Sequence, residues 1–186
     1  ADHIFLGEAD GDFAGTGVSL SGDADGDGKN DILIGAEGCA DSGCAYLIYA
    51  DTILTSPRAF NLANADIKFN GENANDAAGY TTFARDIDGD GKDEVLIGAF
   101  NAAGTAGKGY LFFSSSLQDP TMELGNADHI FVGEASGNQS ALSIDGNGDI
   151  DGDGIGDILI DGSGSGESAY RAGKSYLFLG SSLGNS

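Results

Sequence analysis

Three acidic segments recur along the chain at a spacing of 63 residues, and each leads directly into a short apolar segment. Acidic side chains occupy positions 1, 3, 5 and 9 of each segment, and glycines occupy positions 4 and 6. The three segments are Asp23–Asp31, Asp86–Glu94 and Asp149–Asp157. A chain with this pattern must bring four acidic side chains together three times, within a fold that is itself repetitive.

Four carboxylates that converge in a tight turn repel one another strongly unless a cation lies between them. Calcium accepts about six to eight oxygen ligands, whereas magnesium requires a stricter octahedron and zinc or copper would call for His or Cys ligands. We therefore predict three Ca²⁺ sites per chain, with backbone carbonyls and water completing each shell. The predicted ligand residues, which include the seventh residue of each segment, are Asp23, Asp25, Asp27, Lys29, Asp31, Asp86, Asp88, Asp90, Lys92, Glu94, Asp149, Asp151, Asp153, Ile155 and Asp157.

An EF-hand loop begins in the same way, but it closes with a Glu at position 12 and is flanked by helices. Position 12 here is Ile34, Ile97 or Ile160, each within a short apolar run typical of a buried strand. We therefore expect the ninth residue to close each loop and a strand to follow. Three copies in phase also argue against mere solvated turns.

In the third segment a register that starts at Asp145 would place Ile150 at a glycine position, so we prefer the register from Asp149.

Other segments recur with the same spacing and predict four short strands per repeat, around Phe5, Leu20, Leu33 and Leu47 in the first. The segment 1–8 returns almost unchanged at 127–134 and more loosely at 65–72. A strand-like segment with a central Tyr-Leu follows each acidic segment, and it contains Tyr46, Tyr110 or Tyr176. Four short strands in each repeat of this length are typical of a propeller blade. We predict an all-β propeller fold of three four-stranded blades in one domain, 1–186, with repeats at approximately 1–63, 64–126 and 127–186.

These motifs resemble the FG-GAP repeats of integrin α-subunit propellers and of many secreted bacterial and fungal proteins. The most specific element is an acidic loop that leads into a strand and Gly-Ala, as in Asp23–Ala36 and Asp86–Ala99. The motifs that name the family are altered: Ala14-Gly15 and Ala78-Gly79 stand for Phe-Gly. Gly35-Ala36-Glu37, Gly98-Ala99-Phe100 and Asp161-Gly162-Ser163 stand for Gly-Ala-Pro. The third repeat departs furthest from the family pattern.

The resemblance implies that each calcium loop joins the first and second strands of a blade. Ile4–Leu6 would then be an outermost fourth strand without its own blade, and Tyr176–Leu179 a third strand without its fourth. Rings usually need about four to eight blades, so three are too few to close. Two arrangements remain open: a homodimer that closes a six-bladed ring by exchanging these edges, or a piece of a longer propeller.

Composition predicts an extracellular setting. The chain has 30 Asp and Glu against 8 Lys and Arg, for a net charge of -22, which disfavours binding to nucleic acid or to anionic membranes. Cys39 and Cys44 are expected to form a structural disulfide rather than a redox pair, because their spacing is not Cys-x-x-Cys. The residues given contain no recognisable signal-peptide pattern and no apolar run of membrane-spanning length. We expect a secreted or cell-surface protein.

No catalytic motif is recognisable, and we predict that the protein is not an enzyme. His3 and His129 occupy equivalent repeat positions, and such residues are more often scaffold than active site. The three repeated tyrosines are expected to pack between blades. The resemblance implies a binding or adhesion module for a protein or glycan ligand. A propeller lectin, or a noncatalytic part of a secreted lyase or lipase, remains an alternative. The candidate ligand loops are Glu37–Gly43, Asn101–Gly107 and Gly162–Ala172.

Overall fold

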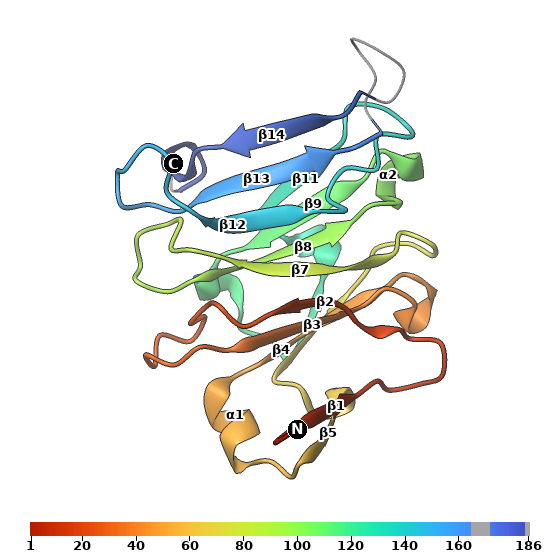
Figure 1. Cartoon of the computed structure of the whole chain (residues 1–186), viewed down its shortest axis with the longest axis vertical. Helices are drawn as coiled ribbons and strands as arrows, with labels where there is room; N and C mark the ends of the chain where they lie inside the picture. Colours follow the sequence, from red (N-terminus) through yellow and green to blue (C-terminus); the bar gives the residue numbers. More distant parts are fainter. Residues whose placement is uncertain (165–171, 185–186) are drawn as a thin grey trace.

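The computed structural model describes residues 1–164 and 172–184 of the 186-residue chain. Fourteen β-strands in this part form three sheets of five, seven and two strands. Figure 1 shows them as a stack, from β1 (Ile4–Leu6) and β5 (Ala59–Asn61) at one end to β14 (Lys174–Phe178) at the other. The predicted all-β class is confirmed, but the described part of the chain does not close into a ring.

The five-stranded sheet belongs to the first repeat. Its strands are β2 (Ala14–Ser19), β3 (Ile32–Ala36), β4 (Cys44–Ile48), β6 (Ile67–Asn70) and β10 (Thr121–Glu123). They lie in the order β10-β6-β4-β3-β2, and the neighbours from β2 to β6 are antiparallel. The sheet takes β6 and the added edge strand β10 from the second repeat of the sequence, so its four antiparallel strands are offset from the sequence repeat by one strand.

The seven-stranded sheet combines the second and third repeats. Its strands are β7 (Ala78–Ala84), β8 (Glu94–Ala99), β9 (Lys108–Phe112), β11 (His129–Val132), β12 (Ile144–Gly148), β13 (Asp157–Gly162) and β14. They lie in the order β11-β9-β8-β7-β12-β13-β14. A single parallel register pair, Gly146 with Ala84, joins β12, β13 and β14 to the other four strands of the sheet. Gly146 permits this approach because a Cβ there would lie 2.6 Å from the Ala84 Cα atom.

Two short strands lie parallel to the fourth strand of a preceding repeat. β5 pairs with β1, with Phe60 opposite Phe5, and β10 pairs with β6, with Met122 opposite Phe69. Short helical segments make the remaining connections. They are α1 (Ala50–Thr55), α2 (Ala102–Thr105) and the 3₁₀ turns η1 (Cys39–Asp41), η2 (Leu62–Asn64), η3 (Ser114–Ser116), η4 (Leu124–Asn126) and η5 (Gly180–Ser182).

The prediction of three four-stranded blades is not confirmed. The first sheet carries a fifth strand, β10, whereas β12, β13 and β14 form a unit of three strands that joins β7 through one register pair. The strand expected around Leu20 ends one residue earlier, at Ser19. Each acidic loop does join the first and second strands of its repeat, and β14 forms the edge of its sheet within the described residues.

The core lies between successive repeats. One apolar cluster joins Leu33 and Leu47 of the first repeat to Val95 and Tyr110 of the second. A second cluster joins Leu96 of the second repeat to Ile160 of the third. Close backbone packing accompanies both, since a Cβ at Gly35 would lie 1.6 Å from the Gly79 carbonyl oxygen. A Cβ at Gly98 would likewise lie 2.0 Å from the Ala141 carbonyl oxygen. The glycine of the Gly-Ala motif therefore allows the backbones of successive repeats to pack closely.

Candidate metal centre

The three acidic loops share one backbone conformation. Glycines at positions 4 and 6 all have positive φ, between 77° and 92°: Gly26, Gly28, Gly89, Gly91, Gly152 and Gly154. The turn brings the N–H groups of positions 4 and 6 onto the first carboxylate. Asp86 accepts from Gly89 N at 2.6 Å and from Gly91 N at 2.9 Å, and Asp23 and Asp149 accept equivalent bonds. Glycine fits these positions because other residues rarely adopt such a backbone.

The second loop gathers all four acidic side chains, one from each predicted acidic position. Ligand oxygens of Asp86, Asp88, Asp90 and Glu94 all lie within 4.8 Å of one another. Glu94 begins β8 and is fully buried, at 0% exposure. Its Oε2 accepts from Ile87 N at 2.6 Å, whereas its Oε1 is buried without a hydrogen-bond partner in the described part of the chain. Burial, reinforced by the neighbouring carboxylates, raises the pKa of Glu94 to about 9.

The first loop gathers three carboxylates, those of Asp23, Asp25 and Asp27, within the same 4.8 Å limit. The fourth, Asp31, is buried and accepts backbone bonds from Ala24 N and Ala50 N, both at 2.9 Å. Burial raises the pKa of Asp31 to about 6. Through these two hydrogen bonds, Asp31 connects the loop to the start of α1.

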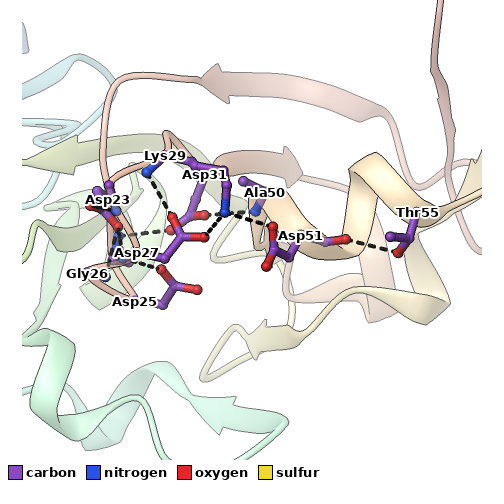
Figure 2. Close-up of polar contacts among 11 residues, drawn as sticks. Asp23, Asp25, Gly26, Asp27, Lys29, Asp31, Ala50, Asp51 and Thr55 are labelled. Carbon is purple, nitrogen blue, oxygen red and sulfur yellow. Dashed lines mark hydrogen bonds and ion pairs between the residues drawn. The ribbon is translucent and has the colours of Figure 1, made fainter.

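Lys29 is the distinguishing feature of the first loop, and Figure 2 shows its ammonium group between two carboxylates. It forms ion pairs with Asp27, inside the loop, and with Asp51 of α1, at 2.8 Å. The pKa of Asp27 is lowered because Lys29 donates to it. This cation therefore neutralises one of the predicted ligands.

The third loop also gathers three of the predicted acidic residues: Asp149, Asp151 and Asp157. Asp157 accepts from Ile150 N at 2.6 Å and from Gly180 N at 2.9 Å. Asp153 lies outside this group and accepts from Ile155 N. Asp145, the start of the alternative register, is in β12 and also lies outside the group, so the arrangement follows the register from Asp149.

The seventh residues take a backbone role in the loops. Lys29, Lys92 and Ile155 each donate their N–H to the carboxylate at position 5, at 2.8–2.9 Å. Metal coordination by their carbonyl oxygens stays a prediction. Burial also raises the pKa of Asp25 and of Asp88, and nearby carboxylates add to the effect. These raised pKa values indicate that negative charge in the loops carries an energetic cost.

The remaining predicted residues fall into three groups. Cys39 and Cys44 form a disulfide with Cα atoms 5.4 Å apart, as expected. His129 contacts the carbonyl oxygen of Leu183 at 3.0 Å and lies against two phenylalanine rings, which is a packing role. Tyr110 is fully buried in the cluster shared by the first two repeats, as expected. Tyr46 is fully buried in a cluster whose buried members all belong to the first repeat, and Tyr176 is partly exposed.

Sequence reasoning missed a recurrent polar contact beside these tyrosines. The Tyr46 hydroxyl donates to Glu8 at 2.9 Å, and Tyr110 donates to Glu72 at the same distance. A lysine completes each contact: Lys68 for Glu8, Lys108 for Glu72 and, in the third repeat, Lys174 for Glu134. The repeated Gly-Glu after each fourth strand was the available signal.

Two of the three candidate ligand loops meet at one groove. It has a volume of about 460 Å³ and lies between the first two repeats, where Glu37, Asp41 and Asn101 line it together with Phe13 and Phe100. Most of the third candidate loop, Gly162–Ala172, lies outside the described residues. No helix in the described part of the chain is long and apolar enough to cross a membrane.

Comparison with known proteins gives one informative similarity. No protein-family model matches the chain. The chain is 29% identical over 174 residues to integrin alpha-PS2 of Drosophila melanogaster, and the match covers 89% of the chain but 11% of that protein. The chain is thus similar to a small part of an integrin α-subunit over most of its own length. This similarity agrees with the resemblance to integrin α-subunit repeats that the acidic loops indicate.

Proposed function

We propose that each acidic loop binds one Ca²⁺ ion and that the three ions stabilise the stack of repeats. The second loop carries this proposal. Its four carboxyl groups converge within 4.8 Å, and one oxygen of the buried Glu94 has no hydrogen-bond partner among the described residues. A hard divalent cation that accepts carboxylate oxygens would satisfy this oxygen and relieve the repulsion. His and Cys ligands are absent from the group, which disfavours zinc.

The same ion would fit the first and third loops after small side-chain changes. In the first loop, Lys29 would leave Asp27 and keep its second partner, Asp51. In the third loop, Asp153 would turn toward Asp149 and Asp151. Such rearrangements cost free energy, so the second loop should bind most tightly and the first most weakly.

Calcium titration of chelator-treated protein tests this proposal directly. We expect isothermal titration calorimetry to give three sites, and Glu94→Gln to remove or greatly weaken one of them. Asp119→Asn, which changes an exposed acidic residue outside the loops, is the matched control and should leave all three. Absence of calcium binding by the folded wild-type protein would refute the proposal.

At the level of the whole module, we propose a non-enzymatic, extracellular binding or adhesion role. The similarity to an integrin α-subunit and the disulfide support it. The groove between the first two repeats is the proposed contact surface, because two loops that differ between repeats form it with two aromatic side chains. Immobilised protein with intact or chelated calcium, probed with extracellular-matrix proteins and a glycan array, would separate a protein-binding module from a lectin.

Homodimeric ring closure is the proposed assembly. Leu159 and Leu177 are 46% and 48% exposed, whereas their equivalents in the second repeat, Leu96 and Leu111, are fully buried against the third repeat. A further repeat stacked on β13 and β14 would cover them. The N-terminal strand β1 of a second copy could pair with the edge of β14, as β11 pairs with β9.

One residue limits how this interface can form. Asp161 of β13 occupies the repeat position at which Gly35 and Gly98 allow close backbone contact. Its side chain would therefore keep β13 further from the strand that faces it across the interface. Sedimentation equilibrium in calcium should give twice the chain mass of 18.7 kDa. A monomer at all concentrations would instead favour the alternative, in which this chain is part of a longer propeller.

A further inference from the structure

A groove beside β11 is open in the third repeat, although equivalent grooves in the first two repeats are filled. It has a volume of about 260 Å³. Phe131 of β11 lines one side, and Ile160, Tyr176 and Phe178 of the third repeat line the other. Tyr176 and Phe178 remain partly exposed, whereas the equivalent Tyr110 and Phe112 are fully buried.

The first two repeats show what fills such a groove. In the first, β5 runs parallel to β1, and Phe60 and Leu62 pack on Ile34, Tyr46 and Ile48. In the second, β10 runs parallel to β6, and Met122 and Leu124 join the cluster that contains the equivalent residues Ile97, Tyr110 and Phe112. Both filling segments have the same pattern: a large apolar residue on the strand, one intervening residue, and a Leu in the 3₁₀ turn that follows.

The open groove has the same walls. Ile160, Tyr176 and Phe178 repeat the set formed by Ile97, Tyr110 and Phe112. β11 is the edge strand of its sheet in the described part of the chain, so its outer backbone groups face no further strand there. The register on β6 fixes the expected alignment, since Thr121, Met122 and Glu123 lie opposite Lys68, Phe69 and Asn70. On β11 these three positions correspond to Ile130, Phe131 and Val132.

We propose that β11 and this groove bind an extended peptide segment, parallel to β11, that carries Met or Phe opposite Phe131 and Leu two residues later. Main-chain hydrogen bonds to the strand edge would supply affinity, and the groove would select the two apolar side chains. This binding mode adds a strand to an exposed sheet edge. The chain contains two instances of it, β5 on β1 and β10 on β6. It does not depend on calcium binding or on the groove between the ligand loops.

The spacing of the repeats offers a direct test. β10 begins nine residues after Phe112. Ser186 lies eight residues after the equivalent Phe178, so a segment joined to it would begin at the same spacing. A segment with the sequence of Thr121–Asn126, joined after Ser186, therefore starts at the position that β10 occupies in the second repeat. Tethering also gives the segment a high effective concentration. We expect this extension to raise Tm by roughly 5 °C or more through burial of Met and Leu. It should also slow amide hydrogen exchange in Ile130–Val132.

The control extension has the same length but carries Ser in place of Met and Leu. It should leave Tm and the exchange rates of β11 unchanged. As a separate molecule, a peptide with the sequence of Thr121–Asn126 should shift the NMR signals of Phe131 and Phe178, and the Ser-substituted peptide should not. Equal Tm values for the two extensions, or protection gained away from β11, would overturn the proposal. Calcium titration of the extended chain tests the metal proposal in a separate measurement, so the two proposals can fail independently.

Discussion

Glu94 accepts a hydrogen bond from the backbone N–H of Ile87 at 2.6 Å through Oε2, and its Oε1 has no hydrogen-bond partner in the described part of the chain. The bond fixes a buried carboxyl group at the closing position of the second loop. Because burial favours the neutral form, the metal-free protein holds a proton there, with the pKa of Glu94 raised to about 9. A bound cation would take the place of that proton.

This relationship predicts how the stability of the metal-free protein depends on pH. Glu94 has a higher pKa in the folded protein than its usual value of 4.5, so the folded state binds the proton more tightly than the unfolded chain. The stabilisation is complete below about pH 4.5 and is lost as pH rises toward 9. We expect Tm in excess chelator to fall across this interval, and calcium to restore it most strongly at pH 8–9.

Glu94→Gln provides the comparison, because the amide keeps the shape of the side chain but does not titrate. Thermal melts of both proteins in chelator, from pH 5 to pH 9, should show a shallower decline for the variant. Parallel curves would mean that Glu94 does not titrate in this interval in the folded protein. Other carboxylates contribute equally to both proteins, so the difference between the curves isolates Glu94.

The disulfide between Cys39 and Cys44 is predicted to stabilise the first repeat. Both residues are buried beside Tyr46, so the double variant Cys39→Ala, Cys44→Ala preserves an apolar environment. Closure of so short a loop should contribute about 2 kcal/mol, and its loss should lower the free energy of unfolding by that amount in urea titrations. Reducing agent should lower the stability of the wild type similarly and leave the variant unchanged. If reduction also destabilised the variant, the effect would not arise from this bond.

Packing between the second and third repeats is predicted to depend on Leu96. This side chain is fully buried in the cluster that contains Ile158 and Ile160. Leu96→Ala should lower the free energy of unfolding by about 2–5 kcal/mol through lost burial and a residual cavity. Leu54→Ala on α1 makes the same chemical change at a side chain that is 67% exposed, and should change stability by less than about 0.5 kcal/mol. Similar losses in the two variants would contradict the inter-repeat core.

Local features of this protein were predictable from sequence because they depend on neighbouring residues. The positive φ values at Gly89 and Gly91 follow from glycines inside an acidic turn, and the strand at Glu94–Ala99 follows from a β-branched apolar run. The contacts of the sheets were less predictable. β10 has only three residues, too few for its alternation to identify a strand, and it is a strand because it lies on β6, about fifty residues earlier in the chain.

Long-range polar contacts also escaped the sequence. Tyr46 and Glu8 are 38 residues apart, and their hydrogen bond depends on how the first strand packs on the first sheet. The resemblance to known repeats placed the acidic loops between the first and second strands, as the structure has them, but it did not reveal that β12 would join β7 through Gly146. Single glycines that allow close approach become informative only when the facing strand is known.

Lys29 gives the last prediction, since its ion pair with Asp27 occupies a predicted calcium ligand in the first loop. Calcium must displace the ammonium group before Asp27 can coordinate. Lys29→Ala removes this competition and one nearby positive charge, so the first loop should bind calcium more tightly. Because this ion pair is exposed to solvent, its contribution is small, and the gain in affinity should be about fivefold or less. Lys92→Ala changes the same loop position in the second site and controls for the general loss of a positive charge. Calorimetry should show one strengthened site in Lys29→Ala beyond any change in Lys92→Ala, and weaker binding in Lys29→Ala would show that the ammonium group supports the loop instead of competing with the ion.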